Sequence, residues 1–184
     1  MEEILADVRR WLAEGRAVAL ATLVAFERSS PRNPGAAMAL NDRGEVAGSV
    51  SGGCVEGDLY ERLQAVLGSG EPAVVDYGIS DEQGFAVGLS CGGTIHVFVE
   101  RLAGAAWWLE RLATEGPLAL ATVVRGPHAG ARLAVTEDGA APAGGTGDAE
   151  MDGAMVAAAR DMLARGRTGL AMDGSVFVAS RAPT

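Results

Sequence analysis

The chain has 184 residues, of which 48% are apolar, and its 15 basic and 24 acidic residues give a formal net charge of −9. This length and composition suit one or two globular domains and exclude a disordered chain, and the acidic balance excludes a nucleic-acid-binding surface. All the basic residues are Arg, and His and Cys each occur only twice, which excludes a P-loop lysine, a Schiff-base enzyme, a helical His-Glu-x-x-His zinc site and a Cys-x-x-Cys framework.

The first hundred residues contain alternating helix and strand patterns. Apolar residues at helical spacing predict a helix over residues 4–12. The apolar run at 17–26, rich in Val, Leu and Thr, predicts a strand. The further elements predicted in chain order are a strand over 38–40, a turn over 41–44, a helix over 55–67 that stops at Gly68 and Gly70, and strands over 73–77 and 94–100.

An imperfect repeat of about 96 residues runs through the chain. The run LAEGRAVALATLV at 12–24 resembles LATEGPLALATVV at 112–124, and residues 55–67 resemble residues 151–163. The second copy repeats the predicted order of elements, with helices near 104–115 and 150–165. Two copies of this length favour a duplicated unit over a solenoid.

This order of elements predicts an α/β fold, a layered mixed sheet with flanking helices. We expect one domain over residues 1–184, built from repeat one (1–100) and repeat two (101–184) in a pseudo-twofold arrangement. The repeats would share one sheet or face each other. No apolar run reaches the roughly 20 residues that a membrane span needs, and the first residues are acidic, so we expect a cytoplasmic protein with reduced thiols and no membrane contact.

Repeat one carries three motifs that repeat two lacks. The first is SSPRNPG at 29–35. Its two prolines fix the backbone, while Ser30 and Arg32 supply hydrogen-bond donors. This loop is predicted either as a plain connection between two strands or as part of a ligand site.

The second motif, GSVSGGCVE at 48–56, leads from a turn into a predicted helix. Its glycines allow backbone N–H groups to approach a bound group, and a helix start offers unpaired donors at the positive end of the helix dipole. An anion would fit this loop, and the same field favours the thiolate form of Cys54. The alternative is that Cys54 is a small buried apolar residue.

The third motif is GLSCGG at 88–93, directly before a predicted strand. Cys54 and Cys91 each lie beside a pair of glycines, and both could reach one end of the sheet. They would then supply two soft metal ligands, or a nucleophile and a resolving thiol. Three acidic residues of the connecting segment would either shape the rim of this site or be solvated: Asp76, Asp81 and Glu82.

Together the three motifs resemble the amino-terminal domain of the XdhC/CoxI family, the accessory proteins of xanthine dehydrogenase and carbon monoxide dehydrogenase. The resemblance is strong over residues 1–100 and loose over 100–180. It implies a chaperone that binds the molybdenum cofactor (molybdopterin) as cargo, aids its sulfuration by a cysteine desulfurase, and delivers it to the apo-enzyme of a molybdenum hydroxylase. Cys54 and Cys91 would contact the metal. The candidate cofactor-binding residues carried over from the motifs are Ser30, Arg32, Ser51, Gly52, Gly53, Cys54, Glu56, Cys91, Gly92 and Gly93.

Many members of that family continue into a Rossmann-type domain, which we do not expect here. The chain ends where such a strand would begin, and no Gly-x-Gly-x-x-Gly follows a strand. Any nucleotide-dependent activity would then come from a partner Rossmann-domain protein, and a homodimer is a further possible assembly.

Two other functions stay open. A sulfur-transfer or thiol enzyme would use Cys54 with His96 as its base, although His96 also suits an ordinary position on a strand face. A non-catalytic scaffold that bridges two proteins would use the apolar cluster at 105–109. In that cluster Trp107 and Trp108 cannot both face one partner, so at least one is expected in the core.

Overall fold

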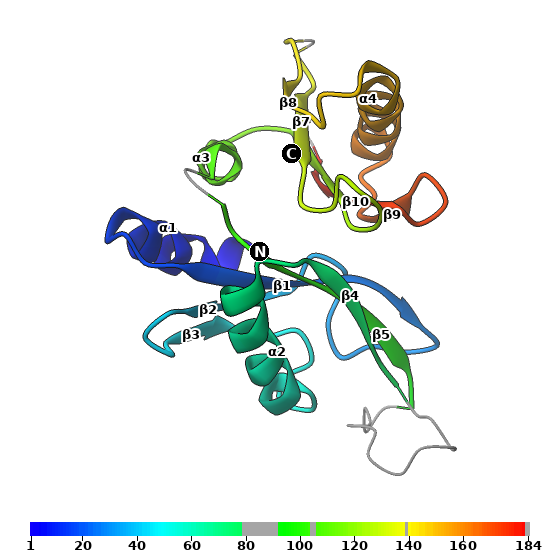
Figure 1. Ribbon diagram of the computed structural model, residues 1–184. Coiled ribbons are helices and arrows are strands. Elements are labelled where there is room, and N and C mark those ends of the chain that lie inside the picture. The colour runs from blue at the N-terminus through cyan, green and yellow to red at the C-terminus, as the bar shows by residue number, and fades with distance from the viewer. Residues whose placement is uncertain (79–91, 104–105, 139, 183–184) are drawn as a thin grey trace. The chain divides into compact units, whose positions relative to one another are not determined.

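The computed structural model drawn in Figure 1 describes residues 1–78, 92–103, 106–138 and 140–182. It divides into two compact units, Met1–Ala105 and Ala106–Thr184, which we call unit 1 and unit 2. Each unit has its own five-stranded sheet, so the two repeats do not share one. The predicted α/β class and the predicted duplication are both confirmed.

Unit 1 consists of a short 3-10 helix, two α-helices and five strands among the described residues. They are η1 (Glu2–Ile4), α1 (Leu5–Ala13), β1 (Val18–Glu27), β2 (Ala37–Asn41), β3 (Val46–Gly48), α2 (Glu56–Ser69), β4 (Ala73–Tyr77) and β5 (Thr94–Arg101). The strand order is β3-β2-β1-β5-β4. The sheet was predicted to be mixed, but every described pairing in it is antiparallel. The strands β1 and β4 run in the same direction, and β5 lies between them and runs in the opposite direction.

Unit 2 repeats this order of elements. They are α3 (Trp107–Ala113), β6 (Leu118–Val123), β7 (Arg132–Thr136), β8 (Ala143–Gly144), α4 (Ala149–Ala164), β9 (Gly169–Ala171) and β10 (Val176–Arg181). The strand order β8-β7-β6-β10-β9 matches that of unit 1 strand for strand. The long helix α4 packs on β6, β7 and β10, as α2 packs on β1, β2 and β5.

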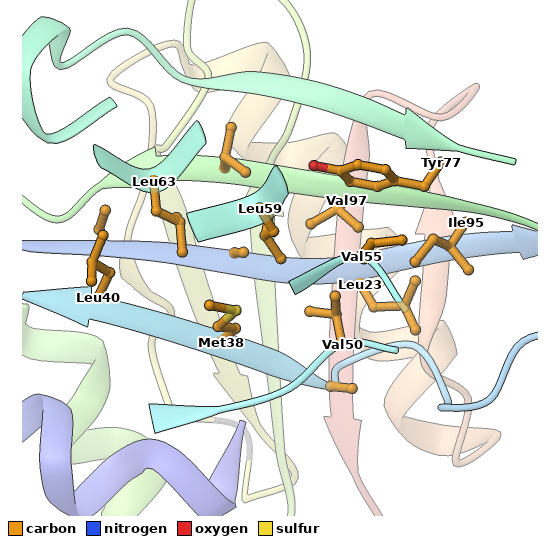
Figure 2. Packing of buried hydrophobic residues seen from close by; sticks show 14 of the residues in the cluster. Leu23, Met38, Leu40, Val50, Val55, Leu59, Leu63, Tyr77, Ile95 and Val97 are labelled. Carbon is orange, nitrogen blue, oxygen red and sulfur yellow. The ribbon is translucent and has the colours of Figure 1, made fainter. Parts of the chain in front are cut away.

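Helix α2 covers one face of the unit 1 sheet. Leu59, Leu63 and Val66 recur at a spacing of about one turn and are buried against the strands. Figure 2 shows Leu59 and Leu63 directed towards the strands that carry Leu40 and Val97. The helix ends at Gly70, whose left-handed φ of 72° suits glycine and whose N–H donates to the carbonyl oxygen of Val66.

The adjacent tryptophans of unit 2 have different surroundings, as the sequence indicated. Trp108 is buried, and the guanidinium of Arg132 lies 4.2 Å from the centre of its ring. Trp107 is 37% exposed. Among the helices of the described part of the chain, none combines the length and the apolar character that crossing a bilayer requires.

Candidate functional site

Parts of the three motifs gather at one end of the unit 1 sheet. At this end β1 finishes and β5 starts, since Phe26 pairs with Ile95. Val50 and Val55, from the loop before α2, pack in the same core cluster as Ile95 (Figure 2). Cys91 lies outside the described residues, so its meeting with Cys54 stays a prediction.

Gly93 brings the third motif against the chain that follows β1. A Cβ atom at Gly93 would lie 2.8 Å from the carbonyl carbon of Ser29, 3.0 Å from the carbonyl oxygen of Glu27, and closer still to the carbonyl oxygen of Ser29. No side chain fits there, so glycine is required at this position by close backbone packing. Its neighbour Gly92 has a left-handed φ of 73°.

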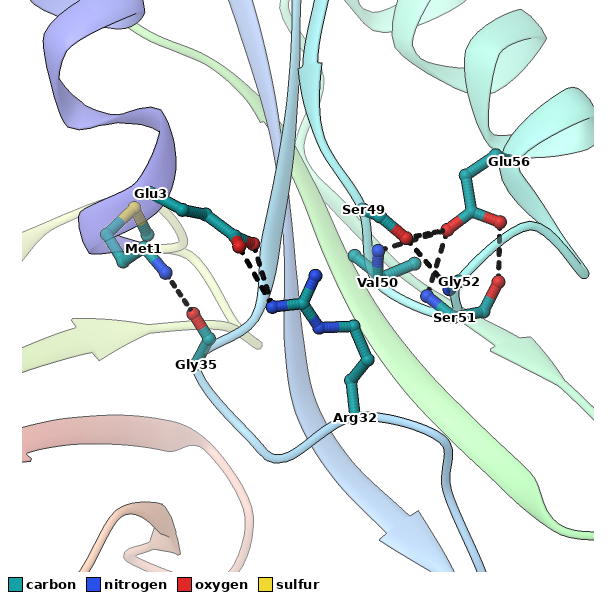
Figure 3. Close-up of polar contacts among 9 residues, drawn as sticks. All are labelled: Met1, Glu3, Arg32, Gly35, Ser49, Val50, Ser51, Gly52 and Glu56. Atoms are coloured by element: carbon teal, nitrogen blue, oxygen red, sulfur yellow. Dashed lines mark hydrogen bonds and ion pairs between the residues drawn. The ribbon is translucent and has the colours of Figure 1, made fainter.

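The first motif forms a loop that is held by a contact within it and by two contacts with the first residues of the chain. The Ser30 hydroxyl donates to the carbonyl oxygen of Arg32 at 2.7 Å. The Arg32 guanidinium forms a salt bridge with Glu3 at 2.9 Å, and the ammonium of Met1 donates to the carbonyl oxygen of Gly35 at 2.7 Å (Figure 3). Arg32 is therefore charge-paired rather than presented alone, and Glu3 is a partner that the motif did not indicate.

The carboxylate of Glu56 lies at the centre of the second motif. Its Oε1 atom accepts hydrogen bonds from the Ser49 hydroxyl at 2.6 Å, from the Val50 N–H at 3.1 Å and from the Ser51 N–H at 2.9 Å (Figure 3). One oxygen of a residue in the first turn of α2 thus reaches back across the whole loop.

The second oxygen, Oε2, completes this network. It accepts from the Ser51 hydroxyl at 2.5 Å, from the Gly53 N–H at 2.8 Å and from the Val55 N–H at 3.2 Å. The two remaining amides of the loop bond to serine hydroxyls: Gly52 N–H to Ser49 and Cys54 N–H to Ser51. All six backbone N–H groups from residue 50 to residue 55 are therefore paired with side chains.

This pairing overturns the prediction that the loop offers unpaired donors to an external anion. The carboxylate of Glu56 already lies where the anion was expected to bind. Burial raises the pKa of Glu56, but the hydrogen bonds from Ser49, Ser51 and the loop backbone outweigh burial and lower the pKa to about 2. Glu56 is consequently ionised at neutral pH, and its charge is balanced by the loop amides and the positive end of α2.

Cys54 is half-buried just before α2. Part of its side chain packs against the core cluster between the sheet and the helix, and the other part is exposed to solvent. The flanking Gly52 and Gly53 have positive φ values of 76° and 119°, and a Cβ on either would meet no atom within 4 Å. These glycines therefore serve the turn rather than close packing.

His96 lies on the opposite face of the sheet from Cys54. Its neighbours Ile95 and Val97 point into the cluster that Cys54 joins, and successive strand residues point to opposite faces. The His96 ring contacts the Asp76 carboxylate at 2.6 Å and lies 3.5 Å from that of Glu27. The sheet thus separates His96 from Cys54, so His96 is not placed to act as the base of a thiol enzyme. Within the described ranges, no group of three His, Cys, Asp or Glu side chains is arranged to hold a metal ion.

Unit 2 has a similar arrangement without the thiol. Asp152 stands 96 positions after Glu56, and its carboxylate accepts from the N–H and the hydroxyl of Thr146, both at 2.7 Å. In this numbering Glu150 occupies the position of Cys54. An acidic residue at matching positions of both repeats was the sequence signal for this role, and the motif comparison missed it.

We expect Tyr77→Phe to lower the free energy of unfolding by about 1 kcal/mol. The hydroxyl of the buried Tyr77 donates to Asp58 at 2.7 Å, which ties the end of β4 to α2. Burial and the Asp58 carboxylate both raise the pKa of Tyr77, so it remains a donor at all ordinary pH values. Urea unfolding measures the loss. Tyr60→Phe is the control, because the Tyr60 hydroxyl accepts an exposed hydrogen bond from Gln64 at 3.3 Å, and its loss should cost less than half as much.

Comparison with known proteins decides the family. The sequence profile of the XdhC and CoxI family matches residues 11–78 in unit 1 and 111–172 in unit 2. The chain belongs to the XdhC and CoxI family. Both units of this XdhC and CoxI chain therefore carry the family pattern, in agreement with their shared topology.

Two curated relatives match about half of the chain. It is 36% identical over 85 residues to a probable xanthine dehydrogenase subunit of Bacillus subtilis (strain 168), in an alignment covering 45% of this chain and 26% of that protein. It is 34% identical over 94 residues to the molybdenum cofactor insertion chaperone PaoD of Escherichia coli (strain K12), covering 51% of this chain and 29% of PaoD. The matched segment thus spans less than a third of either relative.

A solved structure shares the fold. A crystal structure of a xanthine dehydrogenase from Bacillus halodurans matches with a TM-score of 0.69 and 21% sequence identity, over 98% of this chain and 53% of that one. At this identity the match bears on the fold of the XdhC and CoxI chain alone.

Proposed function

We propose that this protein is a molybdenum cofactor accessory protein that carries the cofactor as cargo and transfers it to the apo-enzyme of a molybdenum hydroxylase such as xanthine dehydrogenase. The observation that carries this proposal is the 34% identity over 94 residues to a molybdenum cofactor insertion chaperone. Membership of the XdhC and CoxI family over both units supports it.

Unit 1 offers one group that suits the metal of such a cargo and another that suits its phosphate. The half-exposed Cys54 thiol is a soft ligand of the type that binds molybdenum. The loop amides around it are bonded to Glu56, Ser49 and Ser51, so they are not the contact for a phosphate. Arg32 is the better phosphate contact, because its partly exposed pair with Glu3 contributes only about 0–1 kcal/mol and can be exchanged.

Sulfuration of the cargo and the assembly of the complex belong to the same proposal. A cysteine desulfurase would supply the sulfur while the cofactor is bound in unit 1, and a second copy of the chain or a Rossmann-domain protein would complete the assembly. Size-exclusion chromatography of the mixed, purified components tests each of these partners separately.

Cofactor retention tests the central claim. Protein purified without oxygen from a molybdenum-competent host should carry molybdenum, measured by mass spectrometry, and pterin, measured by fluorescence after oxidation. Cys54→Ala should reduce both about tenfold, which corresponds to about 1.4 kcal/mol of binding free energy. Glu150→Ala, at the matching position of unit 2, should retain as much as the wild type.

Two results would contradict the proposal in different ways. If the wild-type protein retained neither molybdenum nor pterin, it would not be a cofactor carrier. If Cys54→Ala retained as much as the wild type, the carrier function would stand but the thiol would not be its metal contact.

A further inference from the structure

Building on the proposed function, we infer that Glu56 is a positioning residue: its carboxylate holds the loop of residues 49–55 in the shape that presents the Cys54 thiol, and it does not contact the cargo. The family motif offered Glu56 as a cofactor ligand, whereas here Glu56 has a role in holding the loop.

The hydrogen bonds of Glu56 use both of its oxygens. Three donors converge on Oε1 and three on Oε2. An ionised carboxylate only accepts, so it suits a place where every neighbouring polar group is a donor. A glutamine in the same place would turn an NH₂ group towards one of the two sets of donors. The loop therefore requires a carboxylate at this position. Both oxygens of that carboxylate are bonded to the loop, and its negative charge does not suit contact with an anionic cargo.

Ser51 connects this carboxylate to Cys54. The Ser51 side chain is buried, with 2% of the residue exposed. Its hydroxyl donates to Glu56 Oε2 and accepts from the N–H of Cys54 at 3.0 Å and of Val55 at 3.1 Å. The backbone of Cys54 is thus one hydroxyl group away from Glu56. Because Gly52 and Gly53 precede Cys54 and are intrinsically free to change conformation, this connection helps to fix the backbone of Cys54, whose side chain also packs against the core cluster.

Unit 2 supplies an independent argument. Asp152 also accepts hydrogen bonds from the loop before α4, from the N–H and the hydroxyl of Thr146, although Glu150 stands there at the position of Cys54. A carboxylate at this position therefore serves the geometry of the loop in both units. In unit 1 the same device acts on a loop that carries a cysteine.

The test uses the protein without cargo, so that its result is independent of cofactor binding. In a Cys91→Ser background, the only thiol is Cys54, and its reaction with 4,4′-dithiodipyridine is followed by absorbance. Glu56→Gln keeps the size of the side chain but loses half of the acceptors, and Glu56→Asp keeps the charge but loses the reach. Both release the loop and let the partly buried thiol leave the core cluster, so both should raise the reaction rate of Cys54 at least fivefold and speed amide exchange at residues 50–55. Asp152→Asn, the matched control in unit 2, should leave the Cys54 rate within twofold.

Each other outcome overturns the inference. Unchanged rates in both Glu56 variants would mean that Glu56 contributes only to stability. A changed rate in Glu56→Gln alone would show that its charge, not its hold on the loop, matters. Should these variants fail to fold, Ser49→Ala removes one donor to Glu56 and the acceptor of the Gly52 N–H, and it should raise the rate by about threefold. An unchanged rate in folded Ser49→Ala would equally overturn the inference.

Discussion

Replacement of Gly93 by alanine should lower the free energy of unfolding of unit 1 by about 3 kcal/mol or more. The added Cβ would meet backbone atoms of Ser29 and Glu27, which cannot rotate away as a flexible side chain would. Relief requires the chain after β1 to separate from the start of β5. We therefore expect faster amide exchange at that end of β1 and β5, together with displacement of the Ser30 and Arg32 loop.

Gly57→Ala is the matched control for this prediction. Gly57 lies in the first turn of α2, and a Cβ there would meet no atom within 4 Å. The same chemical change should thus be neutral or stabilise by about 0.5 kcal/mol, because alanine favours helix more than glycine does. If Gly93→Ala were as stable as Gly57→Ala in urea unfolding, the close approach of the third motif to Ser29 would be wrong.

The sequence predicted the long elements of the fold because their patterns are local. The apolar run at 17–26 became β1, and the helix expected over 55–67 became α2, within two residues at either end. The short strand Val46–Gly48 escaped prediction, since its residues are partly or fully exposed and it has no apolar period. The antiparallel pairing of the sheets depends on which strand lies beside which, and no local pattern encodes that.

The site was predictable in its place but not in its internal pairing. The motifs containing Cys54 and Cys91 were predicted to reach one end of the sheet, and their described parts lie there, with the backbone of Ser29 from the first motif beside Gly93. The N–H donors before α2 were predicted correctly, but their acceptor was wrong: it is Glu56 and not an external anion. A helix start shows which N–H groups need an acceptor, but not that a side chain of the same helix folds back to supply it. A comparison of charges between the repeats, Glu56 against Asp152, carried that information.

Acid should remove the stabilisation that Glu56 provides. Its pKa is about 2 in the folded protein, below the ordinary value of 4.5 that applies to the unfolded chain. A lowered folded-state pKa contributes stability that is complete above pH 4.5 and is lost as the pH falls towards 2. The linkage relation sets an upper limit of about 3 kcal/mol, and solvent screening of this half-exposed group reduces it to about 1–2 kcal/mol.

The difference between the wild type and Glu56→Gln isolates this contribution from that of other carboxylates. In urea unfolding at pH 7, the variant should be less stable by about 2 kcal/mol, since it loses both the charge and half of the acceptors. That difference should shrink steadily below pH 4.5, because a protonated glutamic acid resembles glutamine in presenting one donor and one acceptor side. Glu61→Gln changes an exposed carboxylate of the same helix and should differ from the wild type by less than about 0.5 kcal/mol at every pH. A difference for Glu56→Gln that stayed constant between pH 7 and pH 3 would mean that the loop amides are not held by an ionised carboxylate.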